Sequence, residues 1–226
     1  MVRFSYDARF SENEYDLWAL GEYLDRLEAQ LVTLRTSDEA RTFAELSAEG
    51  LLDDEESRTI AWQGLEERAD RVYPRLLRGP FLVALWGCYE ATILNVAESI
   101  ATERKLSLQH RDIRGESAVA RARKYFVDYL DIALDKDPIR EMRINDLYVL
   151  RNALAHANGL VSANSDDGKR RIEAIVGRNP TIELNGGFIV PSAEYLRSAF
   201  DDVDSSARDL VQRVRGGPAF RYEEGT

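Results

Sequence analysis

Six leucines at alternating spacings of three and four residues constrain the fold of this chain more than any other feature. They are Leu17, Leu20, Leu24, Leu27, Leu31 and Leu34. This spacing returns an apolar side chain to one face of an α-helix at every turn, which is typical of a seam between packed helices. Ser11 and Glu14 have the spacing of a capping box, so we expect the helix to begin at Ser11.

The sequence predicts that further helices return along this seam. A short helix is expected at 38–49, and the acidic run 53–56 suits the start of the next helix. Apolar residues then recur over 65–76 with helical spacing, and Pro74 is expected to kink or end that helix. Residues 1–78 are therefore predicted to form an acidic helical hairpin, packed on or continuous with the rest of the chain.

A long apolar stretch at 81–101 predicts a central core helix. The tripeptide 78–80, Arg-Gly-Pro, is expected to break the chain before it. Glu90 and Glu98 lie inside the stretch, which favours a buried helix over a membrane span. Residues 1–16 show no apolar segment typical of a signal peptide. We therefore expect a cytoplasmic protein that does not contact a membrane.

The remaining sequence predicts a mostly α-helical bundle with a small β-hairpin before the C-terminal helix. Helices are expected at 117–134, 137–158 and 192–216. The β-rich runs 172–176 and 181–190 predict the hairpin, with a turn near Asn185. Residues 79–226 form the second predicted part of the chain, with a frayed tail at 217–226.

The net charge of −10 is unevenly distributed. Residues 1–70 hold 7 Lys/Arg and 18 Asp/Glu, whereas residues 101–124 hold 7 basic and 3 acidic residues. Overall acidity argues against nonspecific coating of nucleic acid, because such binding depends on neutralising phosphates. A small basic cleft that binds nucleic acid is compatible with the overall acidity. Alternatively, both charged segments are simply helix faces exposed to solvent. The basic residues considered for contact with an RNA backbone are Arg121, Arg123, Lys124, Lys169, Arg170 and Arg171.

Two histidines are the strongest candidates for acid or base chemistry at neutral pH. His110 lies in a polar segment and is expected to be exposed, whereas His156 follows Arg151 late on a predicted helix. Arg151 and His156 lie about 140° apart around that helix, but Asn152 and His156 share a face. Asn152 is therefore expected to hydrogen-bond the imidazole and select its tautomer. The Arg151 guanidinium suits a phosphate, since its fork pairs with two oxygens.

The segment around His156 resembles the R-x4-6-H motif of the HEPN superfamily, in its ribonuclease and toxin-like branch. The resemblance is carried by Arg151-Asn152, three residues and His156, followed by the predicted helix end Asn158-Gly159. The preceding apolar helix around Tyr89-Glu90, and the hairpin and final helix after the motif, are also similar. The resemblance covers roughly residues 80–213.

This resemblance implies an HEPN-like helical bundle and a metal-independent endoribonuclease, as in toxin or phage-defence effectors. His156 would take the proton of a 2′-hydroxyl, and Arg151 would stabilise charge on the phosphate, leaving 2′,3′-cyclic phosphate ends. No metal or other cofactor is implied. The implied partners are a second copy of the chain, forming a homodimer with both motifs in one cleft, the RNA substrate, and an antitoxin or partner protein.

Two other functions compete with a ribonuclease. The chain could be a non-catalytic HEPN-like module that binds a nucleotide, RNA or protein, or a helical protein that binds a partner through the seam at 17–34. Arg151 could simply pair with Asp146 or with an acidic residue on a neighbouring helix, and His156 could serve to place positive charge at a helix C-terminus. Glu90 needs a partner in its apolar helix, so it either supports Arg151 or belongs to a structural ion pair.

Overall fold

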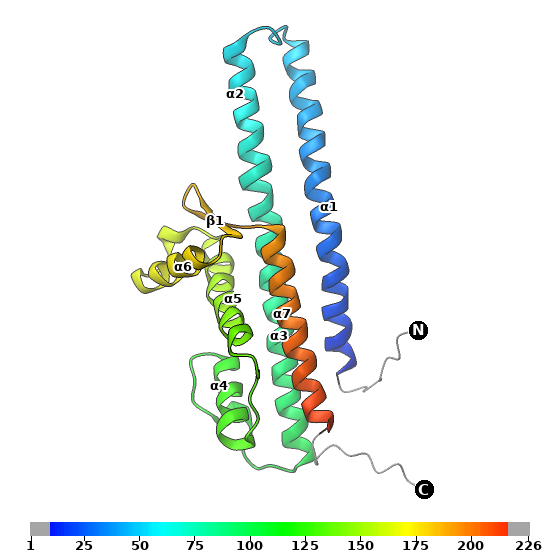
Figure 1. The fold of residues 1–226 in the computed structure, drawn as a ribbon, viewed down its shortest axis with the longest axis vertical. Coiled ribbons are helices and arrows are strands. Elements are labelled where there is room, and N and C mark those ends of the chain that lie inside the picture. The colour runs from blue at the N-terminus through cyan, green and yellow to red at the C-terminus, as the bar shows by residue number, and fades with distance from the viewer. Residues whose placement is uncertain (1–9, 217–226) are drawn as a thin grey trace. The chain divides into compact units, whose positions relative to one another are not determined.

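The structure is a computed structural model that describes residues 10–216, so the tail predicted at 217–226 lies outside the described residues. The side chain of Ser11, the expected helix cap, also lies outside them. The elements, shown in Figure 1, are α1 (Ser11–Ala48), α2 (Glu55–Glu66), η1 (Glu67–Val72), α3 (Tyr73–Glu103), η2 (His110–Asp112), α4 (Ala118–Lys124), η3 (Tyr125–Tyr129), α5 (Pro138–Ala157), η4 (Val161–Ala163), α6 (Asp166–Arg178), β1 (Ile182–Asn185), β2 (Phe188–Pro191) and α7 (Ala193–Gly216). The predicted mostly α-helical fold with a small β-hairpin before the last helix is confirmed.

The chain divides into two compact units. Among the described residues, the first unit contains 10–20, 84–147 and 199–216, and the second contains 21–83 and 148–198. The boundaries fall inside α1, α3, α5 and α7, so each of these helices contributes to both units.

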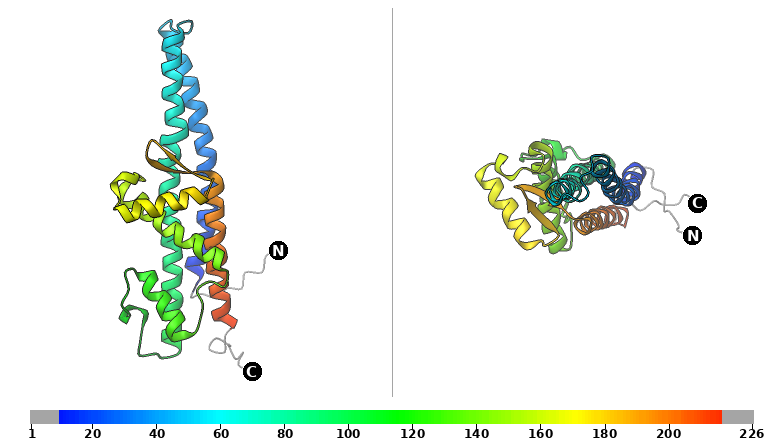
Figure 2. Two further views of the ribbon diagram at one scale, coloured as in Figure 1. Left: turned by 60° about the vertical axis from the view of Figure 1, so that its left-hand side comes forward. Right: turned by 90° about the horizontal axis from the view of Figure 1, so that it is seen from above.

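Within the second unit, α1 runs antiparallel to the helical segment formed by α2, η1 and α3 (Figures 1 and 2). Ion pairs join the two sides. Arg78 donates to both carboxylate oxygens of Glu28, at 2.8 and 2.7 Å, and Arg35 donates to Asp70 at 2.6 Å. Early residues of one side pair with late residues of the other, which confirms the predicted helical hairpin in this unit.

The leucine seam is covered by the packing of the protein itself. Leu17, Leu24 and Leu27 are buried, and Leu20, Leu31 and Leu34 are half-buried. An apolar seam stabilises a helix in proportion to the surface that it removes from water. The seam is therefore part of the core rather than an open surface for another protein.

The separate helix predicted at 38–49 is wrong, because α1 continues to Ala48 without interruption. The carboxylate of Asp38 is buried inside the hairpin rather than capping a new helix. It accepts hydrogen bonds from the Tyr73 hydroxyl at 2.6 Å and from Arg68 Nε at 3.3 Å. The Tyr73 hydroxyl and these guanidinium contacts hold the pKa of Asp38 below its usual value. Tertiary partners thus stabilise an acidic residue in mid-helix.

The chain stays helical through Pro74, where a kink or an end was expected. Residues 67–72 form the π-helical segment η1, in which Tyr73 N–H bonds to the carbonyl of Arg68, five residues earlier. A proline removes one backbone donor and crowds the preceding turn. The wider π-turn lies directly before Pro74, and the chain then continues as α3.

The helix break predicted at 78–80 is also wrong, since Gly79 and Pro80 lie inside α3. Gly79 is buried against α5: a Cβ atom at this position would lie 3.2 Å from Leu154 Cδ2. The glycine therefore allows close helix packing rather than ending a helix. The division of the chain at residue 78 stays a prediction, and the compact units follow other boundaries.

Among the described residues, one helical run, Glu55–Glu103, is long and apolar enough to cross a membrane by length and composition. Half of its apolar window is buried inside the protein, and the core helix of a folded domain passes the same test. The fully buried side chains in this part of α3 include Phe81, Leu82, Leu85 and Ile93. The predicted localisation stays a prediction.

The strand predicted at 172–176 is wrong, because this segment belongs to α6. Ser165 caps the helix by accepting a hydrogen bond from Gly168 N–H at 3.2 Å. Ile172 and Ile175, three residues apart, are both buried, so the β-branched residues follow the helical period. Local propensity for a strand is overridden by this capping and burial.

The hairpin predicted within 181–190 is confirmed. Strands β1 and β2 pair antiparallel, with Asn185 opposite Phe188. Gly186 and Gly187 form the turn with φ of +58° and +81°, a left-handed region that glycine adopts without strain.

The helix predicted at 117–134 ends early. It consists of α4 and the π-helical η3, and the chain leaves helical geometry before Asp131, whose φ is +55°. The predicted helices over 137–158 and 192–216 are confirmed as α5 and α7. Asp137 caps α5 as expected, since its carboxylate accepts from Ile139 N–H at 2.9 Å.

A buried ion pair in the first unit holds the segment before α5. The side chain of Asp135 is 1% exposed and accepts hydrogen bonds from Arg140 Nε at 2.7 Å and Nη2 at 2.8 Å. Arg140 also donates to Asp209 of α7. Burial alone would raise the pKa of Asp135, but hydrogen bonds from Arg140, the Asp137 N–H and Ser206 hold it below its ordinary value.

We expect Asp135→Asn to lower the free energy of unfolding by about 3 kcal/mol at pH 7, because it removes the buried carboxylate that accepts two hydrogen bonds from Arg140 and leaves that guanidinium with Asp209 as its charged partner. The lowered pKa means that this stabilisation is present above about pH 4 and is lost as the pH falls further. Urea unfolding at pH 7 and below pH 4 measures both effects. Asp166→Asn is the control, since its side chain is 93% exposed. If the free energies of unfolding of wild type and Asp135→Asn differed by the same amount at both pH values, this role of Asp135 would be contradicted.

Candidate functional site

The motif residues lie on the last two turns of α5, in the second unit. Arg151 and Asn152 are half-buried, whereas His156 is exposed. The helix ends at Ala157, as predicted, and Asn158 follows with φ of +48°. The imidazole of His156 is therefore accessible on the final turn of a helix.

Asn152 contacts Arg151 rather than His156. Arg151 Nη1 donates a hydrogen bond to Asn152 Oδ1 at 2.7 Å, and no bond between Asn152 and His156 is found among the described residues. The predicted role of Asn152 in selecting the histidine tautomer is thus not supported by this geometry. A charged guanidinium is the stronger donor for the amide oxygen, which explains the difference.

The Arg151 guanidinium is held in place but retains unused donors. Its Nε is buried and has no hydrogen-bond partner. Asn152 is a neutral partner, so it leaves the positive charge uncompensated. A buried donor without an acceptor is costly, and the guanidinium group as a whole suits an anion with two oxygens. Glu90 and Asp146, both considered as partners of Arg151, belong to the first unit, where Glu90 is half-buried and Asp146 buried.

The β-hairpin is joined to the end of α5 by backbone hydrogen bonds. Val161 N–H donates to Gly187 O at 3.0 Å, and Ile189 N–H donates to Gly159 O at 2.9 Å. These two bonds flank Phe188 and fix its position beside the C-terminal end of α5.

Two arginines from the helical hairpin lie over the Phe188 ring. The guanidinium carbon of Arg75 is 4.1 Å from the ring centroid, and that of Arg71 is 5.5 Å from it. Arg75 Nη1 also lies 3.5 Å from the carbonyl oxygen of Asn158. We call Arg71, Arg75 and Phe188 the arginine cluster. It was not predicted from the sequence, although Arg71 and Arg75 are four residues apart, a spacing that places two side chains on one helix face.

The predicted RNA contacts on α4 are engaged with the protein. Lys124 donates to a backbone carbonyl of the preceding loop at 3.3 Å, and Arg121 makes a longer contact of 3.5 Å to another carbonyl of that loop. Arg123 forms an ion pair with Glu141. These residues belong to the first unit, whereas the motif belongs to the second.

The predicted contacts on α6 lie in the second unit on an open helix surface. Lys169 pairs with Asp166 at 3.1 Å, and Arg170 pairs with Asp167 at 3.5 Å. Arg171 is exposed. Ion pairs within one exposed helix are weak, so these side chains stay available to a phosphate.

His110, expected to be exposed, is half-buried at the start of η2. Burial lowers the pKa of its imidazole. His110 belongs to the first unit, so His156 is the histidine of the motif-bearing unit.

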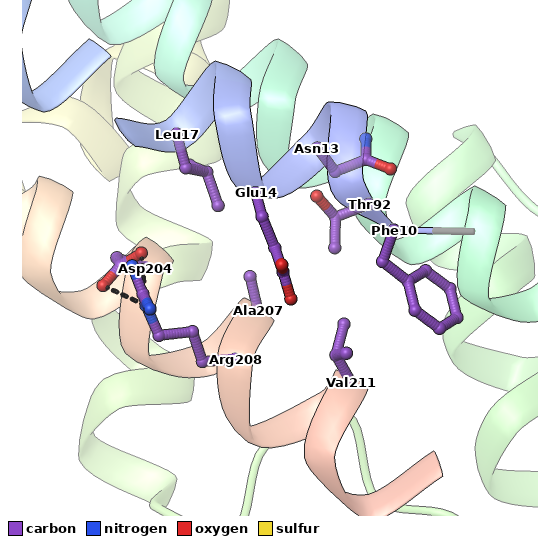
Figure 3. Close-up of a pocket in the computed structure, with 9 residues that line it drawn as sticks. All are labelled: Phe10, Asn13, Glu14, Leu17, Thr92, Asp204, Ala207, Arg208 and Val211. Atoms are coloured by element: carbon purple, nitrogen blue, oxygen red, sulfur yellow. Dashed lines mark hydrogen bonds and ion pairs between the residues drawn. The ribbon is translucent and has the colours of Figure 1, made fainter. Parts of the chain in front are cut away.

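The pocket drawn in Figure 3 lies in the first unit and contains no motif residue. Its lining comes from α1, α3 and α7, with the segment just before α1, and consists of Phe10, Asn13, Glu14, Leu17, Thr92, Asp204, Ala207, Arg208 and Val211. Four of these nine side chains are apolar and five are polar or charged, and Arg208 pairs with Asp204 at 2.7 Å. Over residues 10–216, no group of three or more His, Cys, Asp or Glu side chains is arranged to hold a metal ion.

No family model, curated protein or solved structure matches this chain. The similarity to HEPN domains therefore depends on the motif at 151–156 and on the order of the elements around it. It stays a prediction.

Proposed function

We propose that this protein is a metal-independent endoribonuclease of the HEPN type, with His156 and Arg151 as its catalytic residues. One observation carries the proposal. An exposed imidazole and a guanidinium with a buried, unpartnered Nε lie on the last two turns of one helix. The first suits proton transfer and the second suits a phosphate.

In the proposed reaction, His156 removes the proton from a ribose 2′-hydroxyl. The 2′-oxygen forms a bond to the adjacent phosphorus, and the bond to the 5′-oxygen breaks. A second acid returns a proton to the leaving oxygen, so the products are a 2′,3′-cyclic phosphate and a 5′-hydroxyl. Arg151 stabilises the negative charge on the phosphate oxygens in the transition state.

This reaction needs both a base and an acid, and each motif supplies one histidine. Arg151 and His156 also lie about 140° apart on their helix, so one chain does not direct both toward the same point. We propose that a homodimer brings two motifs together, with one His156 as the base and the other as the acid. Such an enzyme fits a toxin or phage-defence effector restrained by an antitoxin or partner protein.

We expect the purified protein to cleave a mixed RNA pool in the presence of EDTA. The new ends should be 2′,3′-cyclic phosphates and 5′-hydroxyls, and DNA of the same sequences should stay intact because it lacks the attacking hydroxyl. Gel analysis with end-group chemistry distinguishes these products. Cleavage that requires a divalent cation, or that leaves 3′-hydroxyl ends, would exclude this mechanism.

A module that binds RNA without cutting it is the second candidate. It is favoured by the contact between Asn152 and Arg151, because His156 has no positioning partner on its own helix among the described residues. Such a protein would bind the RNA pool and leave it intact. The third candidate, binding of a partner through the leucine seam, is less favoured because three of the six seam leucines are buried and the other three are half-buried by the protein's own packing.

A further inference from the structure

We propose that the arginine cluster, Arg71, Arg75 and Phe188, is a subsite that binds a phosphate of an RNA strand beside the end of α5. The inference rests on the proposed function for the identity of the ligand as RNA. The cluster lies entirely in the second unit, as do Arg151 and His156.

The stacked arrangement leaves the arginines able to bind an anion. A guanidinium that packs its flat face on an aromatic ring keeps its N–H donors in the plane, where they point away from the ring. Both arginines approach the same ring, at 4.1 and 5.5 Å from its centroid. Arg75, for which the described residues offer no carboxylate partner, can pair with two oxygens of a phosphate.

The cluster contains buried donors that the protein does not satisfy. Among the described residues, the buried side-chain N and O atoms without a partner are the Nε atoms of Arg71, Arg75 and Arg151. All three belong to guanidinium groups of the second unit. The carbonyl of Asn158 is 3.5 Å from Arg75, which is long for a hydrogen bond. Each of these Nε atoms thus lacks the acceptor that a buried N–H ordinarily has, which is costly.

The positive charge of the cluster is only partly compensated within the protein. Arg71 pairs with Glu67 on the preceding turn, and for Arg75 no carboxylate partner is found in residues 10–216. Because Glu67 already compensates Arg71, Arg75 is the cation of the cluster whose charge a phosphate would neutralise.

The neighbouring backbone holds the cluster in a defined arrangement. Phe188 is fixed by the backbone hydrogen bonds of Gly187 and Ile189 to the segment after α5. The turn lies against the guanidinium of Arg71, because a Cβ atom on Gly186 would be 2.5 Å from Arg71 Nη1. Arg71 itself lies in the π-helical segment η1, a type of irregularity that is frequent at functional sites.

The subsite lies beside the helix end that carries His156. In this unit, α3 and α5 run antiparallel: Gly79 packs against Leu154, and Arg75 lies next to Asn158, two residues beyond His156. A strand whose phosphate occupies the cluster would pass along the end of α5. The cluster therefore suits a phosphate that flanks the cut bond rather than the reacting phosphate itself.

Binding of a non-cleavable RNA tests the subsite separately from catalysis. A fluorescent mixed-sequence 2′-O-methyl RNA lacks the attacking hydroxyl, so its anisotropy reports binding alone. We expect Arg75→Gln to raise the Kd about tenfold, as for loss of a hydrogen-bonded charge. The slope of log Kd against log salt should fall by about 0.7 for each phosphate that the variant no longer neutralises. Phe188→Leu should weaken binding while keeping most of the salt slope, because both charges remain.

Arg58→Gln is the matched control, with the same change of charge at an exposed position on α2. Thermal unfolding verifies that each variant is folded, and Arg75→Lys should recover part of the affinity because it restores the charge without the fork. Equal Kd and equal salt slope for wild type, Arg75→Gln and Arg58→Gln would overturn the subsite, as would equal losses in both variants. Inorganic pyrophosphate is the competitor that tests for a free-phosphate site: displacement of the RNA at equal phosphate concentration would overturn the assignment to an RNA strand.

Cleavage of unmodified RNA separates this inference from the proposed function. Arg75→Gln should raise KM and leave kcat unchanged, whereas His156→Ala should bind the 2′-O-methyl RNA as wild type does. Binding that depends on Arg75 in a protein that cuts no RNA would support the subsite and exclude the ribonuclease. Cleavage that depends on His156 and does not change in Arg75→Gln would support the ribonuclease and exclude the subsite.

Discussion

Replacing His156 with alanine should lower the rate of RNA cleavage about 10²–10⁴-fold, the range that a positioned acid or base contributes. The substitution should leave the fold intact, because the side chain is exposed and exposed substitutions change stability by about 0.5 kcal/mol or less. Cleavage under single-turnover conditions, combined with urea unfolding, measures both quantities. His110→Ala is the matched control, since it removes the histidine of the other unit.

Arg151→Lys should be tested beside these variants. Lysine keeps the positive charge but loses the planar fork, so we expect slower cleavage with little change in RNA binding. Cleavage by His156→Ala at the wild-type rate would exclude His156 as the base and would indicate a contaminating nuclease or another site. If His110→Ala lost cleavage and His156→Ala did not, the catalytic site would have to be assigned to the first unit.

Leu24→Asp should lower the free energy of unfolding by about 4 kcal/mol or more. Leu24 is 2% exposed in the seam, so the substitution removes apolar contacts and places an unpaired carboxylate in the core. Val32→Asp is the control on the same helix, because Val32 is 68% exposed and should change stability by about 0.5 kcal/mol or less. Urea denaturation followed by far-UV circular dichroism gives both values. A Leu24→Asp protein as stable as Val32→Asp would mean that the seam is open to a partner after all.

Several elements could be predicted from the sequence because local signals decide them. The alternating spacing of the leucines determines which face of α1 is buried, as Leu24 and Leu27 show. Asp137 before Pro138 determines the start of α5, and Asn158 with Gly159 determines its end, since Asn and Gly tolerate the left-handed backbone.

Other predictions failed where tertiary contacts outweigh local preference. The chain stays helical at Pro80, where the sequence indicated a break, and Gly79 packs against Leu154. Residues 172–176 carry a β-branched pattern, yet Ile172 and Ile175 are buried on one face of α6. In both cases the local sequence does not specify which other helix or core the segment packs against.

The candidate site divides in the same way. Arg151, Asn152 and His156 are adjacent in the sequence, so their place on one helix end followed from helical periodicity alone. Helical periodicity did not determine the hydrogen-bond partner of Asn152, because that partner depends on side-chain geometry. The arginine cluster depended on tertiary structure altogether: Arg75 and Phe188 are distant in sequence, and only backbone hydrogen bonds between the β-hairpin and the end of α5 bring the ring to the guanidinium. Periodicity and capping determine single elements, whereas contacts between elements distant in sequence arise only when the chain folds.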